Sequence, residues 1–249
     1  MNTSNLLGLV FVLLFFGLML FFAFTGRKKT QRYLRDIPAF SRLRRGIGLA
    51  VEAGQRLHIS LGRGGVMGPE GTSALVGLSM LQRIARAASI SDRPPVATSG
   101  EGTLAVLSQD TLQNVYHSIG AESQYEPSLG QISGLTPFSY AVGALPVIFD
   151  RQVAVNILTG HFGSEVALLT DASERNGALT LAGSDNIPAQ AVLYATAQEP
   201  LIGEELYAGG AYIQAGPMHL PSVRTQDILR WVLIAGILAG SVLKLVGVM

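Results

Sequence analysis

The most glycine-dense stretch of the chain, Gly62 to Gly71 (Gly-Arg-Gly-Gly-Val-Met-Gly-Pro-Glu-Gly), has the residue types of an anion site. Glycines expose backbone N–H groups, and the helix predicted to follow would add the positive end of its dipole. The spacing departs from both common phosphate motifs, because Gly68 stands one residue beyond the dinucleotide pattern and no lysine precedes Thr72. A tight turn that lets a helix pack closely on a sheet is the simpler explanation of these glycines.

A second turn, from Thr159 to Glu165, contains a histidine, a serine and a glutamate, which are the residue types of a hydrolase. The nucleophile elbow of such enzymes requires Gly-x-Ser-x-Gly, and the sequence Gly163-Ser164-Glu165 does not supply it. We therefore expect Ser164 to cap a helix, with Glu165 favourable in its first turn. His161 is expected to face a ligand at the end of a strand.

The remaining titratable residues form no recognisable catalytic or metal-binding set. His58, His117 and His219 have no ligand spacing between them, and the chain has no cysteine, which excludes thiolate nucleophiles and cysteine-based metal sites. Glu101 and Asp185 stand in turns where they could bind hydroxyls or a cation, although helix capping is the plainer role. The sequence predicts no catalytic residue, no metal and no cofactor.

These turns are positioned by alternating strands and helices. Strands are expected at Leu57–Leu61, Val96–Ser99, Val153–Leu158 and Ala178–Ala182, each followed by a glycine turn and a helix. Alternation on this scale predicts an α/β fold, a Rossmann-like and mostly parallel sheet with helices on both faces.

Right-handed crossovers make such strands point the same way, so the turns at Gly62, Gly100, Gly160 and Gly183 should meet at one edge of the sheet. That edge is the usual ligand-binding crevice of open α/β domains, and a phosphate-bearing small molecule is the ligand its glycines would suit. The candidate ligand-binding residues are Gly62, Gly64, Gly65, Gly68, Gly71, Thr72, Ser99, Gly100, Gly102, Thr103, Gly160, His161, Gly163, Ser164, Gly183 and Ser184.

The helices and loops of this domain are predicted from apolar spacing and from proline and glycine positions. Thr72 or Ser73 should cap a helix that reaches Ala88, and Pro146 should disturb the helix that starts at Pro137. Further helices are expected at 45–55, 104–119, 164–172 and 187–197, a surface loop at 121–135, a turn at 159–164, and an amphipathic segment broken by glycines at 200–212.

Two apolar runs flank the domain, Leu6 to Phe24 and Trp231 to Val248, and each is about as long as the roughly 20 residues that cross a bilayer. A cleaved signal peptide fits the first run poorly, because no Lys or Arg precedes it and its apolar part is too long. The expected organisation is an external N-terminus at 1–5, a transmembrane helix at 6–26, a basic juxtamembrane segment at 27–44, the α/β domain at 45–221 and a second transmembrane helix at 228–248.

Cations adjoin the domain-side end of both runs, which predicts that the domain is cytoplasmic and both termini lie outside the inner (plasma) membrane. They are Arg27, Lys28, Lys29, Arg32, Arg35, Arg42, Arg44 and Arg45 after the first run, and Arg224 and Arg230 before the second. The same cations could bind anionic lipid headgroups of the bilayer. Gly236 and Gly240 form a small-xxx-small pair, which suits packing against the first helix or another copy, hence a homo-oligomer or a membrane complex.

The composition agrees with this organisation. Hydrophobic residues make up 48% of the chain and charged residues 14%, against about 25% charged in average soluble proteins. The net charge of +1 argues against nucleic acid as a partner, because no excess of cations is present to displace counterions.

The segments Ile202–Ile213, Ser222–Ile228 and Asn156–Glu165 resemble a family of uncharacterised prokaryotic membrane proteins with a C-terminal membrane helix. The resemblance would cover most of residues 45–247 and implies the same architecture. It implies no activity and no functional residue.

Three functions remain open on this sequence. The chain could be a non-catalytic module that binds a small ligand or a partner at the membrane, or a structural subunit of a larger membrane complex. It could also be an enzyme acting on a nucleotide or phosphorylated metabolite held at the glycine-rich turns. The lack of a complete catalytic set favours the first two functions over the enzyme.

Overall fold

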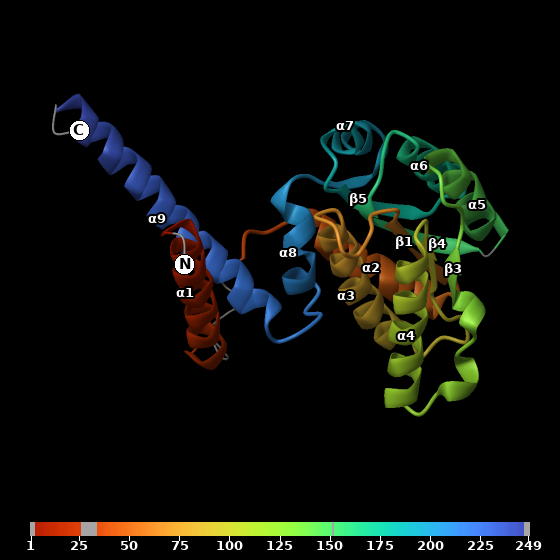
Figure 1. Ribbon diagram of the computed structural model, residues 1–249. Helices are drawn as coiled ribbons and strands as arrows, with labels where there is room; N and C mark the ends of the chain where they lie inside the picture. The colour runs from red at the N-terminus through yellow and green to blue at the C-terminus, as the bar shows by residue number, and fades with distance from the viewer. Residues whose placement is uncertain (1–2, 26–33, 151, 247–249) are drawn as a thin grey trace. The chain divides into compact units, whose positions relative to one another are not determined.

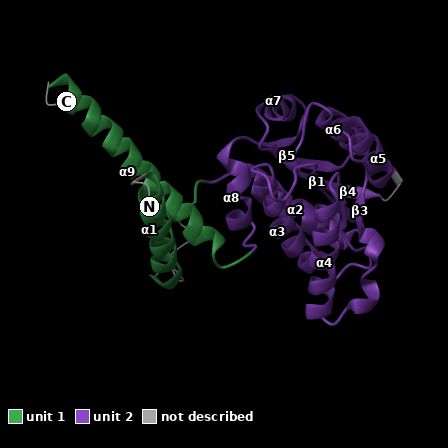
Figure 2. Ribbon diagram, in the orientation of Figure 1, with its two compact units in different colours: residues 1–35, 216–249 green, residues 36–215 purple. Residues whose placement is uncertain are grey.

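The computed structural model describes residues 3–25, 34–150 and 152–246. The chain divides into two compact units, one formed by residues 1–35 and 216–249 and the other by residues 36–215 (Figure 2). The predicted juxtamembrane cations Arg27, Lys28, Lys29 and Arg32 lie outside the described residues.

The larger unit is built on a six-stranded, fully parallel sheet with the order β3-β2-β1-β4-β5-β6. The strands are β1 (Arg56–Gly62), β2 (Val96–Ser99), β3 (Gly130–Ile132), β4 (Val153–His161), β5 (Leu179–Ser184) and β6 (Glu199–Leu201). The predicted Rossmann-like α/β class is thereby confirmed. The order reverses between β1 and β4, which makes the carboxyl ends of these two strands the topological switch point of the sheet.

Helices cover both faces of the sheet (Figure 1). One core is shared by the strands with α2 (Pro38–Glu52), α3 (Gly71–Ala88) and α4 (Gly102–Ser118), and α8 (Glu204–Tyr212) adjoins α3. The other core is shared with α5 (Pro137–Asp150), α6 (Val166–Arg175) and α7 (Ile187–Thr196). Because successive side chains of a strand point to opposite faces, Leu57, Ile59 and Leu61 of β1 join the first core, whereas His58 and Ser60 are directed to the second face.

A glycine in α3 brings this helix close to the switch point. A Cβ at Gly77 would lie 2.5 Å from the hydroxyl oxygen of Thr159 on β4 and 2.7 Å from a methyl carbon of Leu61 on β1. Any larger side chain would force α3 away from the two central strands. This close approach fixes the start of α3 beside the ends of β1 and β4.

Three strands extend further than predicted, and β1 does so by one residue at each end, Arg56 and Gly62. Thr159, Gly160 and His161 were expected in a turn, but they are the last residues of β4, and Gly183 and Ser184 are the last residues of β5. The extension follows from ladder pairing, because Gly62 is registered with His161 and Gly160 with Ser184. The turn after β4 is therefore confined to Phe162–Glu165.

Two short strands were missed. The predicted surface loop at 121–135 was wrong in part, because it contains two 3₁₀ turns (Glu122–Gln124 and Pro127–Leu129) followed by β3, which pairs with β2. The predicted amphipathic segment at 200–212 overlaps β6 and becomes regular as α8. Both strands have only three residues, too few to show the alternation of polar and apolar residues that predicts a strand. Each forms by pairing with an adjacent strand of the sheet.

Several predicted helix ends were also wrong. The helix α2 begins at Pro38 rather than Arg45, and α5 continues through Pro146, beyond which Ile148 is buried in the second core. The N-cap of α3 is Glu70, which makes no side-chain capping bond, while Thr72 and Ser73 lie inside the helix. Ser164 does not cap α6 by a side-chain bond, because this helix begins at Val166 with Glu165 as its N-cap.

The smaller unit contains two helices that are long and apolar enough to cross a membrane, α1 (Thr3–Thr25) and α9 (His219–Leu245). α1 contacts α9 within this unit, and the guanidinium of Arg224 lies 5.9 Å from the ring centre of Phe22. Gly236 and Gly240 of α9 face open space, since a Cβ added to either would have nothing within 4 Å. The small-residue pair is therefore not used to pack α1.

Candidate functional site

The residues predicted as ligand contacts all lie at the carboxyl edge of the sheet, where their contact with a ligand stays a prediction. Strand ends contain Gly62 of β1, Ser99 of β2, Gly160 and His161 of β4, and Gly183 and Ser184 of β5. The first helical turns contain Gly71 and Thr72 of α3 and Gly102 and Thr103 of α4. Gly64, Gly65, Gly68, Gly100, Gly163 and Ser164 lie in the connecting loops.

The glycine-rich loop between β1 and α3 folds on itself. The amide of Gly68 donates to the carbonyl of Gly65 and the amide of Gly71 to the carbonyl of Gly68, each over 3.1 Å. A Cβ at Gly71 would lie 2.5 Å from the carbonyl oxygen of Val66, and a Cβ at Gly64 2.6 Å from that of Glu70. Two of the amides that would bind a phosphate are thus already bonded to carbonyls of the same loop, so these glycines stabilise a compact turn.

Backbone contacts also close the switch point between β1 and β4. Gly62 has a φ of +70°, which favours glycine, and the next amide, that of Arg63, donates to the carbonyl of His161 over 3.0 Å. The amide of Gly100 in turn donates to the carbonyl of Gly62 over 2.8 Å. The turns after β1, β2 and β4 are therefore joined directly to one another.

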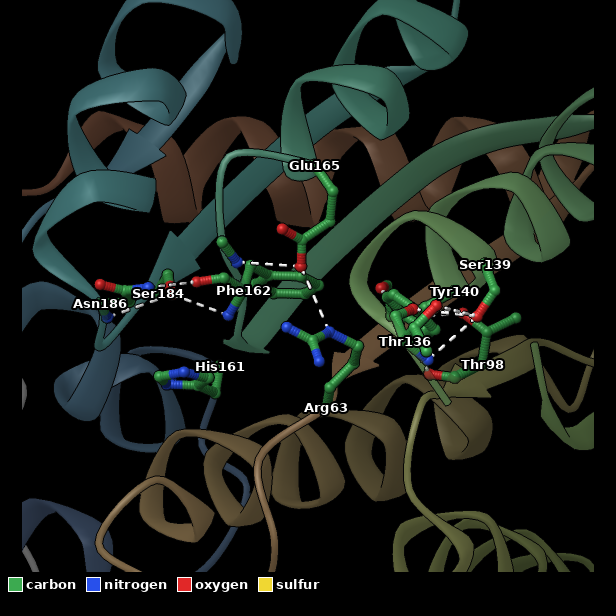
Figure 3. A network of polar contacts seen from close by, with 12 residues as sticks. Arg63, Thr98, Thr136, Ser139, Tyr140, His161, Phe162, Glu165, Ser184 and Asn186 are labelled. Carbon is green, nitrogen blue, oxygen red and sulfur yellow. Dashed lines mark hydrogen bonds and ion pairs between the residues drawn. The ribbon is translucent and has the colours of Figure 1, made fainter. Parts of the chain in front are cut away.

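An ion pair spans this switch point (Figure 3). Nε of Arg63 donates to Oε1 of Glu165 over 3.3 Å, and the same oxygen accepts from the amide of Gly163 over 2.9 Å. The Glu165 side chain is only 3% exposed, whereas that of Arg63 is 20% exposed. Because a buried carboxylate requires a charged or hydrogen-bonding partner, Arg63 and Glu165 hold each other in place.

A second polar pair lies at the ends of β4 and β5. Nδ1 of His161 donates to Oδ1 of Asp185 over 2.9 Å, and the two side chains are 24% and 13% exposed. This bond leaves Nε2 as the ring atom able to meet a ligand, and among the described residues it has no hydrogen-bond partner. Tyr207 of α8 lies near Asp185. Burial, and then the negative charge of Asp185, raises the pKa of the Tyr207 hydroxyl.

The Ser184 hydroxyl and the Glu101 carboxylate at this edge accept hydrogen bonds from backbone amides of the turns. The Ser184 hydroxyl accepts from the amides of Phe162 and Asn186, each over 3.2 Å. Oε2 of Glu101 accepts from the amide of Leu104 over 2.9 Å, which confirms it as the cap of α4. Burial opposes the charge of Glu101, but the bonds donated by Thr103 and Leu104 prevail and lower the pKa of this carboxyl.

A buried polar network beneath this edge was not predicted as a unit. His58 of β1 donates from Nδ1 to Oδ1 of Asn156 over 2.7 Å, and its Nε2 accepts from the Thr98 hydroxyl over 2.8 Å. The Tyr140 hydroxyl bonds to that of Ser60, and its closeness to Thr98 is visible in Figure 3. The signal that could have found the network is the polar residue at every second position of β1, where an apolar residue would be usual.

The two ionisable members of the network are held neutral. Burial lowers the pKa of His58 to about 4, although the bond with Asn156 opposes the shift. Burial raises the pKa of Tyr140 above its ordinary value. The network therefore adds hydrogen bonds to the core without adding charge.

Taken together, the described residues at this edge offer polar groups that are fixed by hydrogen bonds and ion pairs. Within the described residues no hydroxyl is hydrogen-bonded to His161, and no group of three His, Asp or Glu side chains could hold a metal ion. Arg63 and Glu165 neutralise each other at the switch point. Such an arrangement can orient a ligand through hydrogen bonds.

Comparison with known proteins gives a family and no activity. No curated protein matches the chain, and no solved structure matches it. One family model, described as a domain of unknown function, DUF6754, matches residues 1–249. This confirms the expected membership of a family without assigned activity, and it transfers no functional residue. The chain belongs to the DUF6754 family.

Proposed function

We propose that the protein is a membrane-attached, non-catalytic binding module with its α/β domain in the cytoplasm. In this proposal α1 and α9 cross the membrane, and the ligand is a small polar molecule bound at the switch-point edge. Its contacts are the side chains of Arg63 and His161, with the loop from Gly62 to Gly71 and the turn Phe162–Glu165 beside them.

The observation that carries the proposal is the pair of interactions that fix Arg63 and His161 at the switch point. Glu165 holds Arg63, and Asp185 holds His161, while the backbone of Arg63 is bonded to that of His161. Both side chains are partly exposed, so the Arg63 guanidinium presents donors to solvent, and His161 presents its Nε2, in defined orientations. Preorganised polar groups of this kind bind a ligand with little loss of side-chain entropy.

The nature of the ligand is argued from two opposing features. The strand order is the one typical of dinucleotide-binding domains, which favours a nucleotide. The Glu165 carboxylate, however, pairs with Arg63 of the glycine-rich loop and so compensates its positive charge. The amides of Gly68 and Gly71 donate to carbonyls of the loop itself. We therefore favour a ligand without phosphate, recognised by side chains, with a phosphate-bearing ligand as the alternative.

Thermal unfolding of the full chain in detergent tests this proposal. The panel should contain uncharged and cationic metabolites beside ATP, NAD and a phosphosugar. A ligand at 100 times its Kd stabilises a protein by about 2.7 kcal/mol, which is on the order of 5–10 °C for a chain of this size. We expect a shift with a phosphate-free ligand, and a shift only with ATP, NAD or the phosphosugar would support the alternative.

Substitutions at the edge assign the site. His161→Gln should abolish the thermal shift, whereas Arg175→Gln should preserve it, because Arg175 forms an exposed pair with Asp171 on the outer face of α6. Arg63→Met alone would leave the buried Glu165 carboxylate unpaired, so the double variant Arg63→Met/Glu165→Gln is the one to use. A folded double variant that still binds the ligand would remove Arg63 from the site.

Two results would overturn the proposed function. The absence of any shift across the panel, with a large uniform particle by light scattering, would favour a structural subunit of a membrane complex. Conversion of the stabilising ligand, followed over time by mass spectrometry, would show an enzyme.

A further inference from the structure

The segment around α5 differs from the rest of the domain in its lack of charge. From Pro127 to Phe149 the chain contains no Asp, Glu, Lys, Arg or His. This segment forms a 3₁₀ turn, the edge strand β3 and nearly all of α5. A charge-free run of this length would ordinarily be buried, and here only part of it is.

The helix α5 has one buried face and one exposed apolar face. Tyr140, Ala141, Ala144 and Ile148 are buried in the second core. The opposite face exposes Phe138 (64%), Val142 (58%) and Phe149 (44%), with the half-buried Leu145 between them. Positions 138, 142, 145 and 149 have helical spacing and so form one stripe, which Leu135, 70% exposed, extends at the start of the helix. We name these five residues the α5 stripe.

The neighbouring helix α6 shows that an apolar outer face is not general in this domain. Its outer face has the exposed ion pair between Asp171 and Arg175, an ordinary solvated surface. The edge strand β3, which precedes α5 in the chain, is itself partly covered, because Nε2 of Gln109 donates to the carbonyl of Gly130 over 2.7 Å. A partner on this side therefore meets the side chains of the α5 stripe, and adding a strand to β3 would displace Gln109.

The size of the stripe fits an interface between two copies of the chain. Five apolar side chains that are each roughly half exposed offer on the order of 400 Å². A standard interface buries about 800 Å² on each partner, of which roughly 65% is apolar in homodimers, or about 500 Å². The stripe thus supplies most of the apolar surface that one partner of a dimer needs.

The chemistry of the stripe also selects the occupant. A surface that binds anionic lipid uses Lys and Arg, and the segment from 127 to 149 has neither. Depletion of charge at the centre is typical of protein–protein interfaces, and interfaces between copies of one protein are the more apolar class. We propose that the α5 stripe packs against the same stripe of a second copy, with the two α5 helices related by a two-fold axis. Val142, the smallest residue of the stripe, lies near that axis, where the helices approach most closely.

A cysteine introduced at Val142 tests the pairing, because the chain has no other thiol. In membranes that contain the full chain, a short bifunctional maleimide should link the Val142→Cys variant to itself roughly tenfold more than it links Tyr194→Cys, since contact raises the effective concentration of the two thiols. Tyr194 is a matched control, because it lies on α7 and is 74% exposed.

Charge on the stripe should separate the two copies. In the Val142→Cys background, Phe138→Glu would bring two carboxylates together across the axis and reduce the cross-linked fraction roughly tenfold. Leu168→Glu, on α6, should leave that fraction unchanged. Gly236→Leu/Gly240→Leu should also leave it unchanged, which distinguishes the stripe from association through the membrane helices.

Two outcomes would overturn the proposal. If a soluble maleimide labels the Val142→Cys variant as fast as Tyr194→Cys and no dimer is cross-linked, the stripe is open to water. If the Val142→Cys variant is shielded from the maleimide and still does not link to itself, lipid or another protein covers the stripe.

Discussion

At the scale of single residues, His58 shows how the core holds a polar network without charge. Its Nδ1 donates to Asn156 and its Nε2 accepts from Thr98, so the neutral imidazole has both of its hydrogen bonds satisfied. A protonated ring would have to donate from both nitrogens in a site from which water is excluded. Burial therefore lowers the pKa of His58 to about 4, from an ordinary value of 6.5.

This shift predicts an acid-dependent loss of stability. Between pH 6.5 and 4 the unfolded chain binds a proton at His58 that the folded chain does not, so the free energy of unfolding falls as the pH falls through this window. The full loss is about 3 kcal/mol, because each unit of pKa is worth about 1.4 kcal/mol. We expect the melting temperature of the purified chain to fall by on the order of 10 °C for this reason alone.

The measurement compares pH dependence between variants. His58→Gln should be less stable at pH 7, yet its melting temperature should fall less steeply between pH 6.5 and 4.5 than that of the parent chain. The exposed His117 provides the comparison, and His117→Gln should change the slope less than His58→Gln does, because its pair with Glu122 is exposed. Equal slopes for the parent and His58→Gln would contradict the assignment of the acid response to His58.

The candidate site could be predicted from sequence only where its parts are local. Glu101 and the amide of Leu104 are three residues apart, and their capping interaction was predicted. The partners Arg63 and Glu165 are separated by 102 positions, and nothing near either residue indicates the other. The predicted cap at Ser164 was wrong, because the N-cap of α6 is the next residue, Glu165. The side chain of Glu165 accepts hydrogen bonds from Arg63 and from the amide of Gly163.

At the scale of elements, the contact between β1 and β4 depends on a glycine without positive φ. A Cβ at Gly160 would lie 2.1 Å from the carbonyl oxygen of Leu61 and 2.9 Å from the amide nitrogen of Gly62. These are backbone atoms of a central strand, which cannot move without breaking the ladder. We expect Gly160→Ala to lower the free energy of unfolding by about 3 kcal/mol, measured by thermal or chemical unfolding in detergent.

A second glycine of the same edge is the control. Gly102 begins α4, and a Cβ there would meet nothing within 4 Å. Gly102→Ala should therefore change the free energy of unfolding by less than about 1 kcal/mol, with stabilisation the expected sign. If Gly160→Ala and Gly102→Ala changed the free energy of unfolding equally, β1 and β4 would accommodate the added Cβ at Gly160 without loss of stability, which would contradict the prediction.

The elements themselves were predictable in proportion to their length. The strands that were predicted have four residues or more, alternate with helices and end in glycine turns, whereas β3 and β6 have three residues each. The length of α5 was underestimated, because Pro146 lacks a backbone donor and therefore predicts a local break in the helix. Packing of Ala144 and Ile148 in the second core outweighs that loss and carries the helix to Asp150.

At the scale of the whole molecule, the α/β unit stands between two apolar helices in the sequence. If both helices cross the bilayer, their ends next to the domain must lie on the same side, because one domain joins them. Within the smaller unit, the contact between Arg224 and Phe22 joins these two ends, as an antiparallel pair requires. Arg35, Arg42, Arg44, Arg45, Arg224 and Arg230 lie on the domain side, and Lys244 lies on the far side.

This distribution of charge predicts the orientation, since positively charged flanks remain in the cytoplasm. Single cysteines can report it in a chain that has none: Met67→Cys, at a fully exposed loop position, against Asn5→Cys and Met249→Cys, which stand outside the two predicted membrane segments. On intact cells a membrane-impermeant maleimide should label Asn5→Cys and Met249→Cys, and should label Met67→Cys only after the membrane is permeabilised. The reverse pattern would place the domain outside, and labelling of one terminal variant alone would mean that one helix does not cross.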